Sequence, residues 1–126
     1  MLPNFLVPEC VSQADETSQE FHLGNNQGKM LQLTLGITRI IEQESIDVAI
    51  WGSSDKTNWG VKPIFSFPQK FYCGVYTILV DLSEHPDVQT IRVQWKLGRW
   101  GRGDPKPMFG FYVFAEEVAD HVMAMG

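Results

Sequence analysis

Residues 97–107 place an indole between two guanidinium groups. Arg99 precedes Trp100 and Arg102 follows it, within a stretch that also holds three glycines and two prolines. A sugar ring or an anionic group is bound well by apolar stacking on one side and charged hydrogen bonds on the other, and these side chains supply both. The composition therefore predicts a ligand-binding loop. A structural role is the alternative, in which Trp100 folds back as a lid and the arginines are solvated.

A second loop, residues 52–60, is rich in residues that form turns. Ser53, Asp55 and Asn58 are spaced so that their side chains can accept hydrogen bonds from nearby backbone amides, and Trp59 can pack across the loop. This chemistry favours a structural turn. Asp55, Asn58 and Trp59 are nevertheless further candidates for ligand binding, because loops carry binding residues more often than strands do.

The sequence offers little that is typical of an enzyme. It contains no Gly-x-Ser-x-Gly, His-Glu-x-x-His or Walker motif. The three histidines are too scattered for a local metal site: His22, His85 and His121. Carboxylate pairs such as Asp81 with Glu84 occur on every protein surface. We therefore expect no catalytic residue, no metal and no cofactor, with an enzyme of unknown type as the third hypothesis.

The net charge is -5 at pH 7, which argues against a protein that binds nucleic acid over its whole surface, because phosphate recognition needs a basic face. The charges are unevenly distributed. Residues 9–20 hold four acidic side chains and no Lys or Arg, whereas residues 88–109 hold five basic side chains and one acidic. This asymmetry predicts a basic end on an otherwise acidic molecule, unless these charges are merely solvated.

The chain of 126 residues, 44% of them hydrophobic, has the size and composition of one domain, so we expect a single domain over residues 1–126. No apolar run approaches the roughly 20 residues of a membrane span, so no membrane partner is expected. Cys10 and Cys73 lack a CxxC motif and are predicted to be buried free thiols. No signal peptide is visible at the start, which predicts a cytoplasmic or particle-associated protein.

Alternation with a period of two dominates the chain and predicts strands at residues 31–37, 46–51 and 91–97. Residues 108–114 are apolar at odd and even positions alike, which is typical of a central strand that is covered on both faces. Weaker strands are expected at 5–11, 18–23, 62–67 and 75–82, and residues 115–125 suit a short terminal helix. About eight strands without intervening helices predict an all-β fold, an antiparallel β-sandwich of jelly-roll type.

The strand that ends in Gly52, Ser53, Asp55 and Trp59, with Ile91-Arg92-Val93 about thirty residues later, resembles the discoidin or F5/8 type C group of galactose-binding-like jelly rolls. The resemblance covers residues 31–118. Lys56 stands where the group usually has glycine, and the N-terminal part looks unrelated. The resemblance implies a sandwich that binds a ligand through loops at one end, without catalysis.

The first functional hypothesis is thus a non-catalytic ligand-binding module, with a carbohydrate or another polyhydroxy or anionic ligand at a loop end formed by Trp59 and Trp100. The second hypothesis is a structural or assembly subunit, a homo-oligomer that associates through aromatic side chains of exposed parity, namely Trp51, Tyr112 and Phe114. The candidate ligand-binding residues are Asp55, Asn58, Trp59, Arg99, Trp100 and Arg102.

Overall fold

The computed structural model describes residues 2–100 and 106–118, and within them the regular structure is β-strand apart from two short 3-10 turns. The strands are β1 (Asn4–Ser12), β2 (Glu16–Thr17), β3 (Phe21–His22), β4 (Met30–Arg39), β5 (Glu44–Ser53), β6 (Phe65–Ser66), β7 (Gly74–Asp81), β8 (Thr90–Arg99) and β9 (Phe109–Glu117). The turns η1 (Gly24–Asn26) and η2 (Leu82–Glu84) precede β4 and β8 respectively. The predicted all-β class is confirmed.

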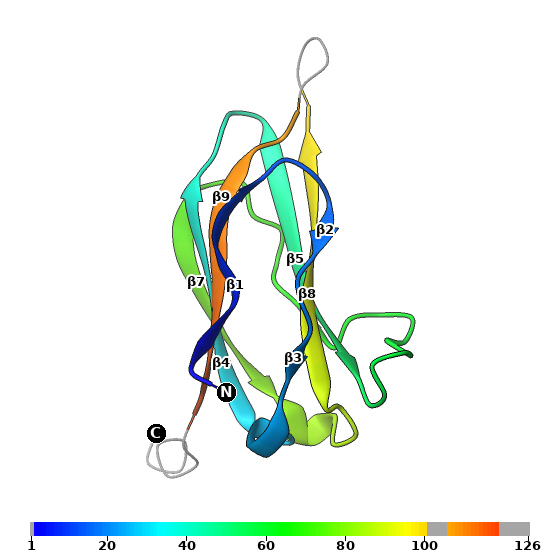
Figure 1. Cartoon of the computed structure of the whole chain (residues 1–126). Helices are drawn as coiled ribbons and strands as arrows, with labels where there is room; N and C mark the ends of the chain where they lie inside the picture. The colour runs from blue at the N-terminus through cyan, green and yellow to red at the C-terminus, as the bar shows by residue number, and fades with distance from the viewer. Residues whose placement is uncertain (1, 101–105, 119–126) are drawn as a thin grey trace.

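The strands form two antiparallel sheets that face each other as the layers of a sandwich (Figure 1). The first sheet has the order β1-β9-β4-β7, and the second has the order β2-β8-β5-β6, with β3 also paired to β8. Because β2 and β3 pair with successive parts of β8, they act as one interrupted strand. Counted in this way, the eight strands have the orders 1-8-3-6 and 2-7-4-5, which is the arrangement of a jelly roll, as predicted.

The core between the sheets is built by the strands with the clearest alternation. Leu33 and Leu35 of β4 pair with Ala115 and Val113 of β9 respectively, and all four are buried. In the second sheet Val93 and Trp95 of β8 lie opposite Ile50 and Val48 of β5. The pleat of each strand sends alternate side chains inward, so the period of two translates directly into these buried rows.

Three predicted elements differ in the structure. Of the strand expected at 18–23, only the two residues of β3 form a strand. The expected strand at 62–67 is only two residues long, because Pro63 and Pro68 flank it and proline has no N–H to donate to a ladder. The expected helix at 115–125 is wrong at its start, since residues 115–117 continue β9 and pair with β4. Ladder hydrogen bonds and a buried Ala115 outweigh the helical preference of these residues. Residues 119–126 lie outside the described part.

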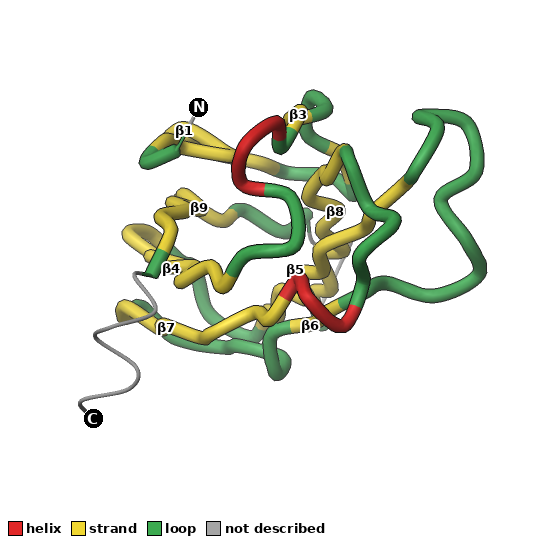
Figure 2. Tube along the Cα trace, turned by 90° about the horizontal axis from the view of Figure 1, so that it is seen from below, coloured by secondary structure: helices red, strands yellow, loops and turns green. Residues whose placement is uncertain are grey.

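The loops gather at the two ends of the sandwich, and β5 separates the two loops singled out by the sequence. Glu44 at the start of β5 pairs with Arg99, and Ser53 at its end pairs with Thr90. Ten residues of strand span about 30 Å. The loop after β5 therefore stands at one end, clear of the sheets when viewed along the sandwich (Figure 2), and Trp100 belongs to the opposite end.

Candidate functional site

The turn after β5 is organised by the carboxylate of Asp55. Its Oδ1 accepts hydrogen bonds from the backbone N–H groups of Asn58 (2.7 Å) and Thr57 (2.9 Å) and from the hydroxyl of Ser53 (3.0 Å). These bonds favour the charged form, the backbone bond from Asn58 most strongly, and lower the pKa of Asp55 below its usual value. The Oδ1 of Asn58 in turn accepts from the N–H of Gly60 (2.9 Å). The predicted structural turn is thereby confirmed.

Trp59 packs against the outer face of the second sheet. The guanidinium carbon of Arg92, on β8, lies 4.1 Å from the centroid of the Trp59 ring. Trp51 is the cross-strand neighbour of Arg92 on the same face. Stacking of a guanidinium on an indole is favourable for both groups, since the ring face carries partial negative charge.

Two buried donors at this cluster lack an acceptor. Among the described residues, neither the indole N–H of Trp51 nor the Nε–H of Arg92 finds a hydrogen-bond partner. Leaving a buried donor unpaired typically costs about 1–3 kcal/mol, so a pair of them on adjacent strands is unusual in a folded protein. The outer face of the second sheet beside Trp59 thus carries two N–H donors without a protein acceptor.

A hollow of about 420 Å³ lies beside Trp59, between the loop after β5 and the segment that precedes β8. Its polar lining includes Ser54, Asn58, Lys62, His85 and Asp87. A volume of this size falls in the usual range for small-molecule sites. Trp59 is half-buried and forms part of the wall, so a ligand in the hollow would meet an aromatic surface.

Trp100, at the opposite end, is 50% exposed and belongs to a row of aromatic side chains. The centroid of its ring lies 6.2 Å from that of Phe71, with the rings at 73°, and Phe71 lies 6.4 Å from Tyr72. The backbone N–H of Trp100 donates to the carbonyl of Gln43 (3.0 Å). Trp100 is thus neither a lid sealed over the core nor an isolated ring in solvent.

Arg99 links two loop segments at this end by hydrogen bonds. Its Nε donates to the carbonyl of Glu42 (3.3 Å), and one terminal nitrogen donates to the carbonyl of Lys106 (3.0 Å). The buried carboxylate of Glu44 also joins the same two segments, because it accepts from the N–H of Met108 (2.7 Å) and from the N–H of Ile41 (2.9 Å). Arg102 lies outside the described residues.

Five of the six predicted site residues lie in the described part of the chain, and they fall into two groups that cannot share one ligand. Asp55, Asn58 and Trp59 are together at one end, and Arg99 and Trp100 are at the other, so the prediction of a single Trp59 and Trp100 loop end is wrong. Arg92, which stacks on Trp59, is not among the site residues predicted from the sequence. Its position in the Ile91-Arg92-Val93 motif, on the outward parity of the clearest strand, was the available signal.

Within residues 2–100 and 106–118, no group of three or more His, Cys, Asp or Glu side chains is arranged to hold a metal ion, and no helix is long and apolar enough to cross a membrane. Cys10 and Cys73 are free thiols, as predicted, but the prediction that they are buried is wrong for both: Cys10 is half-buried and Cys73 is exposed. Neither a scan against protein-family models nor a search of the curated proteins finds a match for this chain.

Proposed function

We propose that this chain is a non-catalytic binding module that holds an acidic polyhydroxy ligand, such as a sugar carboxylate, in the hollow beside Trp59. The observation that carries the proposal is the Trp59 ring, which forms part of the wall of the hollow and is stacked on the guanidinium of Arg92. The indole face that Arg92 leaves uncovered suits the apolar C–H face of a sugar ring, and the ammonium group of Lys62, which lines the hollow, suits a carboxylate.

The rest of the lining supports the same ligand class. Lys62 and His85 add donors for an anionic group, and Ser54 and Asn58 offer hydroxyl and amide groups to sugar hydroxyls. Asp87 is the one acidic residue in the lining of the hollow, and its carboxylate can accept a hydrogen bond from a sugar hydroxyl. Trp59 and the turn that carries it are held by the Asp55 bonds, which reduces the entropy lost on binding.

The test compares D-galacturonate with D-galactose, following the indole N–H resonances of the four tryptophans by NMR during each titration. Galacturonate should bind several-fold more tightly than galactose, and more weakly as salt is raised. Trp59→Ala should lower the affinity at least tenfold. Trp100→Ala, the matched control at the other end, should leave it unchanged.

Lys62→Gln removes a positive charge from the lining of the hollow and leaves the stacking of Trp59 on Arg92 in place. It should remove the preference for the acidic sugar and leave binding of the neutral sugar nearly intact. If neither sugar shifts a tryptophan resonance, or if Trp100→Ala abolishes binding while Trp59→Ala does not, the proposal is wrong.

A second candidate, an assembly subunit, is favoured by the edge strand β7. Within the described part of the chain, β7 pairs only with β4, and it exposes 67% of Val75 and 46% of Leu79. An apolar edge strand with unpaired backbone groups is a template for pairing with another copy. Light scattering tests this candidate: a stable oligomer that Val75→Lys converts to monomer supports it, and a monomeric wild type contradicts it.

A further inference from the structure

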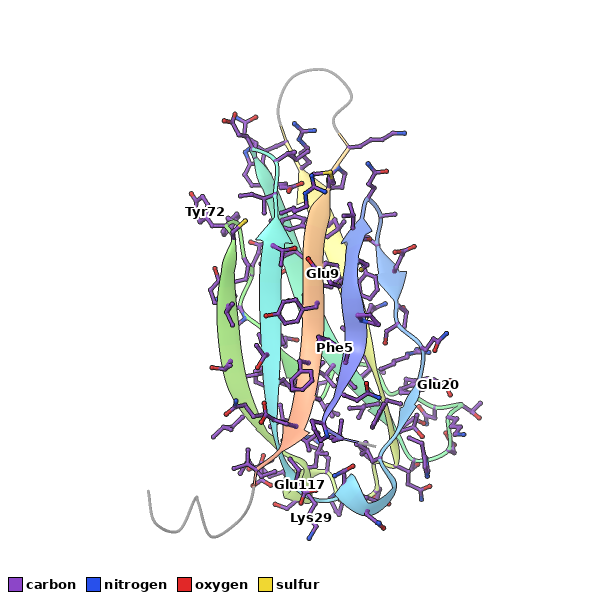
Figure 3. The ribbon with its side chains drawn as sticks, turned by 60° about the vertical axis from the view of Figure 1, so that its left-hand side comes forward. Phe5, Glu9, Glu20, Lys29, Tyr72 and Glu117 are labelled. Carbon is purple, nitrogen blue, oxygen red and sulfur yellow. The ribbon has the colours of Figure 1, made fainter. Side chains whose placement is uncertain are left out.

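The outer face of the first sheet carries an aromatic hollow that is separate from the Trp59 site. Phe5 of β1 and Tyr112 and Phe114 of β9 line it, together with Thr34 of β4 and Glu9. Its volume is about 360 Å³. Figure 3 shows Phe5 and Glu9 on β1 at this face, with Glu9 further along the strand. We call this group the Phe5 hollow.

The Phe5 ring contacts the rings of both Tyr112 and Phe114 and is parallel to neither. The centroid of Phe5 lies 4.9 Å from that of Phe114, with the rings at 65°, and 5.8 Å from that of Tyr112, with the rings at 81°. A cation interacts favourably with a ring when it lies within about 6 Å of the ring centroid. Centroids less than 6 Å apart allow one small cation above the sheet to lie within that distance of the Phe5 ring and of one neighbouring ring.

Gly36 explains why Tyr112 occupies this position. The two residues are cross-strand neighbours on β4 and β9, and a Cβ at position 36 would collide with the Tyr112 ring. The ring therefore lies over the bare backbone of Gly36. The face is a built aromatic surface and not a few scattered exposed side chains.

The charge in the Phe5 hollow is negative. Glu9 is exposed and is the only ionisable acid or base among the lining residues, apart from the phenol of Tyr112. Glu116 follows Phe114 by two positions and so faces the same side of β9. A carboxylate beside aromatic faces attracts an organic cation and repels an anion, so the ligand chemistry here is opposite to that of the Trp59 site.

We propose that the Phe5 hollow binds a small molecule with a methylated ammonium group, of the choline type. Methyl groups on nitrogen spread the positive charge over an apolar surface, which suits ring faces better than a strongly hydrated primary ammonium does. Glu9 supplies the counter-charge from the rim. The proposal goes beyond the Trp59 site and does not depend on it.

The experiment titrates the protein with choline and with 3,3-dimethylbutan-1-ol, the neutral molecule of the same shape, and follows the backbone N–H resonances of β1 and β9 by NMR. Choline should bind at least tenfold more tightly than the neutral alcohol, because only the cation gains from the ring faces and from Glu9. Equal affinities would mean a merely apolar groove and would overturn the proposal, as would no binding by choline.

Two exposed positions test the residues without endangering the fold. Glu9→Gln should weaken choline several-fold, should leave the neutral alcohol unchanged and should reduce the salt dependence. Phe5→Leu keeps an apolar side chain but removes a ring, and it should weaken choline more than the alcohol. Val75→Ala, on the same sheet but outside the Phe5 hollow, is the matched control and should change neither affinity. Choline binding that survives both Glu9→Gln and Phe5→Leu would refute the site.

Discussion

Replacement of Trp95 by alanine should cost the protein a large part of its stability, and the structure indicates how the loss is divided. The Trp95 side chain is 5% exposed and packs at 74° against Phe111, with 5.1 Å between the ring centroids. Its indole N–H donates to the hydroxyl of Ser12 (2.9 Å), inside the protein. Trp95 thus contributes both apolar packing and a buried hydrogen bond.

The two contributions have different sizes. Trp→Ala changes in a core usually cost about 3–5 kcal/mol, through lost burial and the cavity that remains. Trp95 also borders a hollow of about 520 Å³ between β1 and the β2–β3 segment. Water from that hollow can reach part of the new cavity, which places the expected loss for Trp95→Ala in the lower half of the range, about 3–4 kcal/mol.

Trp95→Phe removes the hydrogen bond and only a small part of the packing. It keeps a ring against Phe111 and removes the donor to Ser12, for an expected loss of about 1–2 kcal/mol. Urea unfolding of the three proteins, with midpoint and slope fitted separately, measures both losses. A loss below about 1 kcal/mol for Trp95→Ala would refute the inward orientation of Trp95 and place Arg92 and Lys96 in the core instead. Equal losses for the two variants would refute the packing contribution.

Three further outcomes are expected. Glu44→Gln should lower the free energy of unfolding, measured with urea, by about 1–3 kcal/mol, because the amide nitrogen of Gln would face one of the two backbone N–H groups that the carboxylate now accepts from. Glu42→Gln, at an exposed position, is the control and should leave the free energy of unfolding nearly unchanged. The lowered pKa of Asp55 means that its contribution is complete above about pH 4 and is lost as the pH falls through that lowered pKa, so Asp55→Asn should flatten the acid limb of the stability profile. In the native protein Cys73 should be labelled by a thiol reagent before Cys10, because burial, and secondarily the charge of Glu16, raise the pKa of Cys10. Two thiols should be counted after denaturation without reductant, and a count of none would indicate a disulfide.

Local chemistry was sufficient for a large part of the fold. The alternation at residues 31–37 and 91–97 predicted which side chains are buried, because the pleat of a strand relates neighbouring residues by a fixed rule. The lack of helical periodicity between the predicted strands indicated an antiparallel sandwich, because a parallel sheet needs helices to connect its strands. The turn around Asp55 was also predictable, since its donors lie within three residues of the carboxylate.

Contacts between distant segments were decided only by the tertiary structure. The partner of Trp59 is Arg92, and the partners of Phe5 lie more than a hundred residues later in the chain. No periodicity relates such positions, because they meet only after β5 and β8, or β1 and β9, have paired in one register. The separation of Trp59 from Trp100 has the same origin. The sequence determines that both tryptophans lie in loops, but the direction and length of β5 decide which end of the sandwich each loop occupies.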